Sequence, residues 1–326
     1  MATVNGAAAG ATPRVEQAAL KLGEMLDKGG QGEVWTLTDR PDHVFKRYFM
    51  PNVNTSALEG LVGFPLRLRP SEQRTLQECT AWPTEIVTAK QQAVGFVMRR
   101  VPGEFVARTA SAKGQLRELQ YLLYEPKPLW GDIEPLDADD RVELVRAFVE
   151  LVRILHRHTV VLGDISMRNI LWAPGDPPRL FVLDCDSARF ESSPSVLPQA
   201  NTPDWDDPYG PPGSSDLDSD RYKLALFAGR VLSRDAYVRP GQELHLLPDL
   251  ENPIADLARK SFERAGGARG SRPDADEWAR ALSGRASIAL TPPAPRAPVP
   301  LLPMAEMDSR GEREMIQLRP LPPGRP

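Results

Sequence analysis

Cysteine is nearly absent from this chain of 326 residues, which contains only Cys79 and Cys185. Two thiols cannot build a disulfide-stabilised scaffold, and nothing around them has the paired spacing of a zinc or redox motif. An excess of one charge is also missing, since 40 basic and 44 acidic side chains leave a formal net charge of −4. The chain therefore lacks the basic footprint that is typical of nucleic-acid-binding proteins.

Long hydrophobic runs and a secretion signal are missing as well. No stretch approaches the roughly 18 to 20 apolar residues that span a bilayer. The first residues, MATVNGAAAGATPRVEQ, have no basic segment followed by an apolar one. We therefore expect a reduced, soluble protein of the cytoplasm that binds neither nucleic acid nor a membrane.

The chain does contain enough apolar residues for a large core, with 41% hydrophobic and 26% charged residues. Proline departs from this average composition, because ten of the 33 prolines fall in the last 36 positions. The proline-rich end, 287–326, is typical of polyproline II or disordered linker. It either docks into an aromatic-lined groove of a partner or serves as a spacer. Residues 1–20 show no periodicity and are expected to be flexible.

The residues between these ends show two different sequence patterns. From 21 to 103, short β-like runs such as HVFKRYF and AVGFVMRRV are broken by Pro and Gly, and NTSALEGLV indicates one helix. From 104 to 286 helical patterns dominate, and one of them, DRYKLALFAGRVL, is apolar on almost every face, as a buried helix is. We predict an α+β fold with a small antiparallel sheet and one main helix, followed by a larger and mostly helical part. The clearest helix has one apolar stripe: Val145, Phe148, Val149, Val152 and Leu155.

Three glycines, Gly29, Gly30 and Gly32, crowd a turn in LDKGGQGEVWTL. Glycine lets backbone N–H groups approach a phosphate closely, although most such clusters are ordinary turns. The following run EVWTLTD alternates as a strand does, so the glycines join strand to strand rather than open a helix. This arrangement resembles the loop GxGxxGxV of protein kinases, with Asp27 in place of the first glycine and Val34 at the last position.

Further motifs follow in the order that they have in that family. Lys46 lies 14 residues after Gly32, on the next predicted strand. In VVLGDISMRNILW, Asp164 and Asn169 have the five-residue offset of the pattern HRDxxxxN, and 15 positions later FVLDCDSA places Asp184 where kinases have DFG. The sequence from about residue 22 to about residue 282 therefore resembles the protein-kinase-like family. The string TAWP at 80–83 is similar to a divergent bacterial branch of serine/threonine kinases.

The resemblance implies a bilobal kinase fold that binds ATP and Mg²⁺. Lys46 would hold phosphates, Asp164 would be the catalytic base, and Asn169 and Asp184 would bind the metal ion. Asp220 would brace the catalytic loop from the start of the buried helix. The residues implied at the nucleotide are Gly29, Gly30, Gly32 and Val34 in the loop, Met98 as gatekeeper, and Arg99 to Val101 at the adenine edge.

Two pairings that the family implies depart from their usual pattern in this sequence. Lys46 should pair with a helical glutamate; we prefer Glu59, which leaves room to finish a helix, over Glu72, which follows a proline and is explained by the helix dipole. Arg272 resembles an arginine that usually pairs with the glutamate of an APE motif. The string at 202–204, Thr-Pro-Asp, is a loose substitute whose acid is Asp204.

The catalytic motifs also depart from the usual ones. Leu162 and Gly163 replace the His and Arg of HRD, so we expect no activation by phosphorylation of an activation loop. Ser166 stands where a lysine is usual, and Arg168 could supply the positive charge. Asp186, in the triplet DCD, is either a second metal ligand or a solvated turn residue.

These features leave three functions open. The first is a serine/threonine protein kinase acting on a protein that the sequence does not name. The second is a small-molecule kinase of the same fold, such as the aminoglycoside or choline type, suggested by the Gly-Asp pair but not by the late RP helix. The third is a pseudokinase that binds nucleotide or partners without turnover, suggested by Asp27 and by the altered HRD and DFG. We favour the protein kinase because the lysine, the asparagine and both motif acids are retained.

Overall fold

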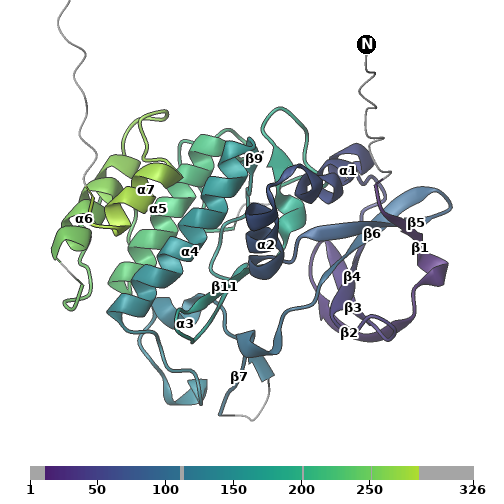
Figure 1. Ribbon diagram of the computed structural model, residues 1–326, viewed down its shortest axis with the longest axis horizontal. Helices are drawn as coiled ribbons and strands as arrows, with labels where there is room; N and C mark the ends of the chain where they lie inside the picture. The colour runs from purple at the N-terminus through teal and green to yellow at the C-terminus, as the bar shows by residue number, and fades with distance from the viewer. Residues whose placement is uncertain (1–11, 111–113, 200–201, 251, 286–326) are drawn as a thin grey trace, which may run out of the picture. The chain divides into compact units, whose positions relative to one another are not determined.

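The computed structural model describes residues 12–110, 114–199, 202–250 and 252–285 (Figure 1). Within these ranges the chain has an α+β fold with a mixed six-stranded sheet, three two-stranded sheets and seven α-helices. The proline-rich segment 287–326 and residues 1–11 lie outside the described residues.

The main sheet contains the predicted strands and one further strand at its edge. All neighbouring strands are antiparallel except the first, β1, which runs parallel to β5. The sheet is therefore mixed, and not purely antiparallel as the sequence suggests. Its strands lie side by side in the order β1 (Arg14–Glu16), β5 (Pro83–Ala89), β6 (Gln92–Arg99), β4 (His43–Tyr48), β3 (Gly32–Leu37) and β2 (Leu22–Lys28).

Strand β1 lies within the segment 1–20 that the sequence predicts to be flexible, so that prediction is wrong for residues 14–16. Residues 14–16 pair with residues 86–88 of β5. The Thr88 hydroxyl also donates a 2.7 Å hydrogen bond to the Glu16 carboxylate. A strand of three residues is too short to show an alternating pattern, and its partner is distant in the sequence.

Two helices, and not one, accompany the sheet. α1 (Thr55–Gly63) begins at Asn54, whose side chain accepts a hydrogen bond from a backbone N–H of the first turn. α2 (Pro70–Cys79) has proline at its first position and Glu72 at its third, and the Glu72 carboxylate accepts the Arg69 N–H at 3.1 Å. Proline needs no N–H partner there, and the acid caps a free backbone group. The second helix is short and polar, so it gives only these terminal signals.

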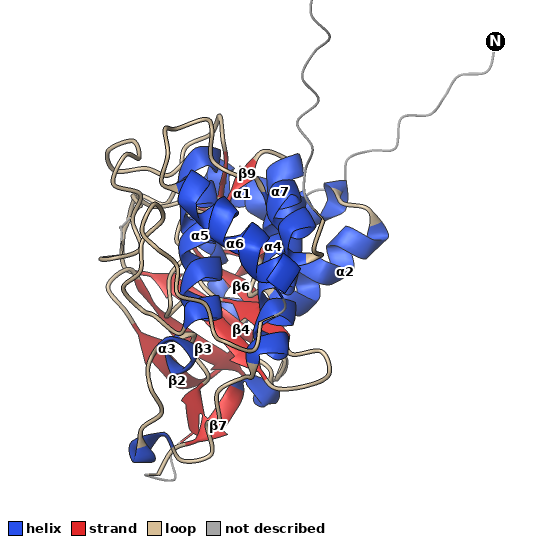
Figure 2. Ribbon diagram, turned by 90° about the vertical axis from the view of Figure 1, so that its left-hand side faces the viewer, coloured by secondary structure: helices blue, strands red, loops and turns tan. Residues whose placement is uncertain are grey.

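The later part of the chain is helical, as predicted, around α4 (Ala138–Arg157) and α5 (Leu217–Ser233) (Figure 2). All five stripe residues of α4 are buried, and α5 is buried on nearly every face. The rings of Phe148 and Phe227 join the two helices, with centroids 4.4 Å apart. Among the described residues, no helix combines the length and the apolar character needed to cross a membrane. The remaining helices are α3 (Gln120–Leu123), α6 (Asn252–Ala265) and α7 (Ala275–Leu282).

Two short antiparallel ladders position the loops that carry the kinase-like motifs. The loop 162–169 runs from β9 to β10, and the loop 183–188 runs from β11 to β12. Because both ends of one loop are paired with both ends of the other, the two loops must lie side by side. The ladders are β9 (Val160–Val161) with β12 (Arg189–Phe190), and β10 (Ile170–Ala173) with β11 (Arg179–Val182).

Glu72 ties α2 to the end of α4 through a buried carboxylate. Its oxygens lie 2.6 Å from Arg69, 3.5 Å from Arg157 and 3.6 Å from His158. The hydrogen bond from Arg69 is the main reason that the pKa of Glu72 falls to about 2.

We expect Glu72→Gln to lower the melting temperature at neutral pH. The folded pKa of about 2 lies below the roughly 4.3 of an unfolded glutamate, so the stabilisation is present above the unfolded value and is lost as the pH falls towards the folded one. Thermal unfolding of both proteins across this range should show the two melting temperatures converging. Glu78→Gln, on the exposed side of the same helix, is the control and should differ little from wild type throughout.

Candidate functional site

The loop between β9 and β10 is fixed by two buried charges of α5. The Asp220 carboxylate accepts the backbone N–H groups of Leu162 at 2.6 Å and Gly163 at 3.0 Å, and it contacts His156 Nε2 at 3.2 Å. Asp220 thus contacts the loop that it is predicted to brace. From the same helix, the Lys223 ammonium donates to the Gly163 carbonyl at 2.7 Å.

Sequence reasoning misses Lys223, although the sequence contains its signal. A lysine three residues after Asp220, on a helix that is apolar on almost every face, must find polar partners or lose hydration without compensation. Its side chain is buried, and its charge acts to lower the pKa of Asp164.

Gly163 stands where kinases have the arginine of HRD, and the backbone explains the exchange. Its φ is +82°, in the left-handed region that favours glycine. A Cβ there would lie 2.9 Å from Gln199 Nε2 and 3.1 Å from the Ser187 carbonyl oxygen. Gln199 cannot move away freely, because its amide exchanges two 2.9 Å hydrogen bonds with Ser215.

Asp164 lies at the centre of the loop, and both of its carboxylate oxygens accept hydrogen bonds. Asn169 Nδ2 donates to Oδ2 at 2.7 Å, and the Thr202 hydroxyl donates to Oδ1 at 2.8 Å. Burial raises the pKa of Asp164, while the Thr202 bond, the Lys223 charge and the Asn169 bond oppose this rise. In the sequence, Thr202 is recognisable only as part of the loose substitute for APE, and not as a partner of Asp164.

Lys46 is buried on β4 and is held by two carboxylates of the loop 183–188. Its Nζ lies 3.0 Å from Asp184 Oδ1 and 2.8 Å from Asp186 Oδ1. Burial alone would lower the pKa of Lys46, but the charges of Asp186 and Asp184 outweigh it and raise the pKa above its ordinary value. The ammonium is therefore charged at neutral pH. On the neighbouring strand, Val34 pairs with Lys46.

Asp184 brings this ion pair near Asp164, because its chain neighbour Leu183 donates its N–H to the Asn169 carbonyl at 2.7 Å. Asp184 has a left-handed backbone, with φ +51°, and its side chain is 51% exposed. Its negative charge acts to raise the pKa of Asp164, so the two acids lie within electrostatic range. The structure therefore brings Lys46, Asp164, Asn169 and Asp184 into one site, while their catalytic roles stay predictions.

Neither glutamate considered as the partner of Lys46 contacts it. Glu59, the preferred one, forms an ion pair with Arg14 of β1, and its side chain is 38% exposed. Glu72 is held by Arg69 at the start of its own helix. The assignment to Glu59 is wrong in this structure, because the edge strand that supplies its partner is not visible in the sequence pattern.

Asp186 is buried against Lys46, so it is not a solvated turn residue. Its second oxygen, Oδ2, accepts the hydroxyl of Tyr48 at 3.0 Å. Tyr48 follows Lys46 by two residues on β4, and alternation along a strand places both side chains on one face. With both oxygens engaged, Asp186 is less available to a metal ion than the half-exposed Asp184.

The donors present suit a metal ion that arrives with a nucleotide. Among the described residues, no group of three or more His, Cys, Asp or Glu side chains could hold a metal ion by itself. Mg²⁺ commonly takes one or two carboxylates together with substrate phosphates. Asp184 offers an exposed carboxylate, and Asn169 bonds Asp164 through Nδ2, which leaves its Oδ1 outside that bond. These two residues fit such an ion.

The glycine turn between β2 and β3 uses its glycines for two reasons. A Cβ at Gly32 would lie 2.3 Å from the Arg47 carbonyl oxygen, so the packing of β3 on β4 requires glycine. Around Gly29 and Gly30, no atom lies within 4 Å of an added Cβ. The space around these two glycines is therefore open, although the Gly29 N–H already donates to the Gly32 carbonyl at 2.9 Å.

The predicted adenine edge at the end of β6 is partly used by the sheet. The Arg100 N–H donates to the Asp42 carbonyl at 2.8 Å, so the middle of the stretch Arg99 to Val101 does not offer its donor to a nucleotide. The Arg99 guanidinium donates to carbonyls at the end of α2. Met98, the predicted gatekeeper, is buried in β6.

Arg272 binds an acid other than the predicted one. Its guanidinium makes a bidentate, buried pair with Asp207, at 2.7 and 3.0 Å. Asp204 instead contacts Arg239 at 3.0 Å. The prediction of Asp204 is wrong because, without an APE string, the sequence does not fix the register of this segment.

Two residues of the loop 162–169, Ser166 and Arg168, differ in exposure. Ser166 is buried and Arg168 is exposed. Burial raises the pKa of Glu118, and the charge of Arg168 opposes that rise, which places Arg168 near Glu118. A role of Arg168 at the transferred phosphoryl group stays a prediction.

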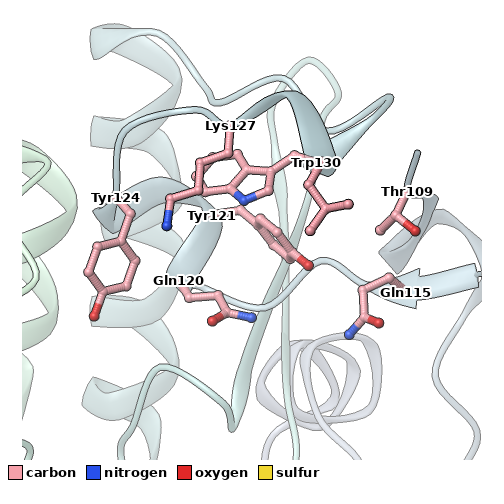
Figure 3. A pocket seen from close by; sticks show the side chains of 8 residues that line it. Thr109, Gln115, Gln120, Tyr121, Tyr124, Lys127 and Trp130 are labelled. Atoms are coloured by element: carbon pink, nitrogen blue, oxygen red, sulfur yellow. The ribbon is translucent and has the colours of Figure 1, made fainter. Parts of the chain in front are cut away.

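A pocket of about 420 Å³ lies beside the same loop (Figure 3). The rings of Tyr121 and Trp130 meet edge to face in its wall, with centroids 5.0 Å apart. Just before α3, the Leu119 N–H is shared between the carbonyls of Met167 at 3.1 Å and Ile170 at 2.9 Å, which ties the pocket to the loop. Its other walls include amide and basic side chains: Gln115, Gln120 and Lys127.

We expect Gly163→Ala to destabilise the protein more than Gly213→Ala. Both glycines have positive φ, +82° and +68°, so both substitutions carry the strain of a left-handed Cβ, about 1 to 2 kcal/mol. Only Gly163 is also crowded, whereas nothing lies within 4 Å of a Cβ at Gly213. Urea unfolding of the two variants measures the difference, and equal losses would contradict the crowding of Gly163.

No model of a known protein family matches this chain, and a search of curated proteins finds no similar sequence.

Proposed function

We propose that this protein transfers the γ-phosphoryl group of ATP to serine or threonine hydroxyls of a protein substrate. The observation that carries the proposal is the meeting of Lys46 with Asp184, and of Asp164 with Asn169, in one site. These residues come from motifs whose order and spacing resemble those of protein kinases. The fold, a sheet followed by a helical part, is compatible with two lobes.

The charges present suit phosphoryl transfer, in which positioning and charge stabilisation do most of the work. The charged ammonium of Lys46, on strand β4, would bind phosphate oxygens beneath the glycine turn at Gly29 and Gly30. Asp184 and Asn169 would hold Mg²⁺, which when bound neutralises charge on the phosphates. The buried contacts of Asp220 and Lys223 fix the loop beforehand, so little ordering is needed when the substrates bind.

Asp164 suits the role of general base, which must accept a proton from a hydroxyl within hydrogen-bond reach. The Thr202 hydroxyl lies 2.8 Å from its Oδ1, so a hydroxyl can occupy that position. The bond from Asn169 fixes the orientation of the carboxylate. An acceptor serine or threonine would replace Thr202 at this oxygen.

One observation favours a pseudokinase as the second candidate. Both oxygens of Asp164 are already bonded, to Asn169 and to Thr202. If Thr202 does not yield its place, no acceptor hydroxyl reaches the base, and the protein binds nucleotide without turnover.

The proposal is tested with purified protein, labelled ATP, Mg²⁺ and generic protein substrates. We expect label in protein, and an Asp164→Asn variant should transfer it about 10² to 10⁴ times more slowly, because general-base assistance is typically of that size. Asp139→Asn, at an exposed acid in the first turn of α4, is the matched control. ATP binding without transfer would favour the pseudokinase, and transfer only to small alcohols would favour a small-molecule kinase.

The pH dependence of the reaction should report the contact between Thr202 and Asp164. The base must be ionised, so kcat/KM falls on the acid side as the pH drops through the pKa of Asp164. Because the Thr202 hydroxyl acts to lower that pKa, Thr202→Val should move the acid limb to higher pH. Thr202→Ser keeps the donor and should leave the limb in place. A limb that shifts equally in both variants would exclude the hydroxyl as the cause.

A further inference from the structure

We propose that Asp186 is the positioning residue of Lys46, in the place that the resemblance assigns to a helical glutamate, and that Tyr48 fixes Asp186. This inference rests on the proposed function, since it names the residue that holds the phosphate-binding ammonium. Asp186 Oδ1 lies 2.8 Å from Lys46 Nζ, and Asp186 Oδ2 lies 3.0 Å from the Tyr48 hydroxyl.

The two acids beside Lys46 differ in what else can reach them. The Asp184 side chain is 51% exposed, so solvent, a cation or a phosphate-bound metal ion can compete for it. The Asp186 side chain is 4% exposed. A lysine ammonium has three donors, so Asp186 can keep one of them while the others turn to phosphate oxygens.

The surroundings hold Asp186 in place. Lys46 and Tyr48 project from one face of β4, and both pack on Phe96 of the adjacent strand β6, at 5.9 Å and 5.8 Å from its ring centroid. On the other side, Cys185 is fully buried, which anchors the chain between the two acids. Because Asp186 is fixed by these contacts, it can hold the Lys46 ammonium without a helix having to bring a glutamate towards it.

The helical glutamates are engaged elsewhere, so they leave this place to Asp186. Glu59 pairs with Arg14, and Glu72 is held by Arg69, Arg157 and His158. The ammonium and its partner therefore lie on β4 and on the loop 183–188, and neither residue belongs to α1 or α2.

A double-mutant cycle tests the inference, read by binding of a fluorescent ATP analogue in EDTA. We expect Lys46→Met to weaken binding about tenfold, near the lower end of what a hydrogen bond to a charged group contributes, and Asp186→Asn to weaken it about fivefold, because Asp186 acts only through the ammonium. The double variant should bind no more weakly than Lys46→Met, because Asp186 acts through the ammonium. Additive losses, or unchanged or tighter binding by Asp186→Asn, would overturn the inference.

Tyr48→Phe is the second variant, in case Asp186→Asn does not fold, and melting temperatures report folding for each protein. We expect it to weaken binding about threefold in the wild-type background and not at all beside Lys46→Met. Tyr209→Phe, at a tyrosine that is 67% exposed, is the matched control. A loss with Tyr48→Phe that persists beside Lys46→Met would contradict the link from Tyr48 to Lys46.

Metal affinity separates Asp186 as a positioning residue from Asp186 as a metal ligand. Binding of Mn²⁺ to the complex with a non-hydrolysable ATP analogue, followed by electron paramagnetic resonance, should weaken strongly with Asp184→Asn and less than twofold with Asp186→Asn. Equal losses in the two variants would make Asp186 a ligand and overturn the inference. So would a loss of metal-free ATP binding with Glu59→Gln that matches the one expected of Asp186→Asn.

These measurements also distinguish this inference from the proposed function. Wild-type protein that binds ATP and transfers nothing would overturn the proposed function, while the binding cycle would still decide the role of Asp186. Wild-type protein that binds no nucleotide would overturn both.

Discussion

The buried ammonium of Lys46, on strand β4, needs a compensating charge, and two acids from one short loop supply it. Lys46 contacts Asp184 and Asp186, which are separated by one residue. Leaving a lysine buried without a partner would cost several kcal/mol or neutralise the group. The position of the loop 183–188 against β4 is therefore constrained by charge as well as by packing.

The second loop depends on the first through the two ladders and on α5 through buried hydrogen bonds. Asp220 and Lys223 bind the N–H and the C=O of Gly163, so a single glycine is held by two opposite charges from one helix. A fixed loop in turn fixes Asp164, whose carboxylate is oriented by Asn169. A backbone at positive φ, closed in by Gln199 and Ser187, therefore favours glycine at position 163.

The sequence predicts the parts of this arrangement that depend on local pattern. The run EVWTLTD after Gly32 alternates in the sequence, the stripe of α4 repeats with the helical period, and a five-residue offset keeps Asp164 and Asn169 on one loop. Partners that depend on distant contacts cannot be read in this way. Glu59 has a suitable distance along the chain, yet it turns to Arg14, which belongs to a strand of three residues with no visible pattern.

Tyr48 and Lys223 are two residues whose buried polar contacts could have been predicted from the sequence. Each is a polar residue at a position that the local period buries: Tyr48 lies two residues after Lys46 on a strand, and Lys223 lies on a helix that is buried on nearly every face. A buried hydroxyl or ammonium requires a partner. The sequence therefore predicts a polar contact at both positions without identifying the partner. The partners, Asp186 and the Gly163 carbonyl, follow only when the fold brings the loops together. Burial periodicity therefore predicts which side chains need a partner, and tertiary structure decides which partner they find.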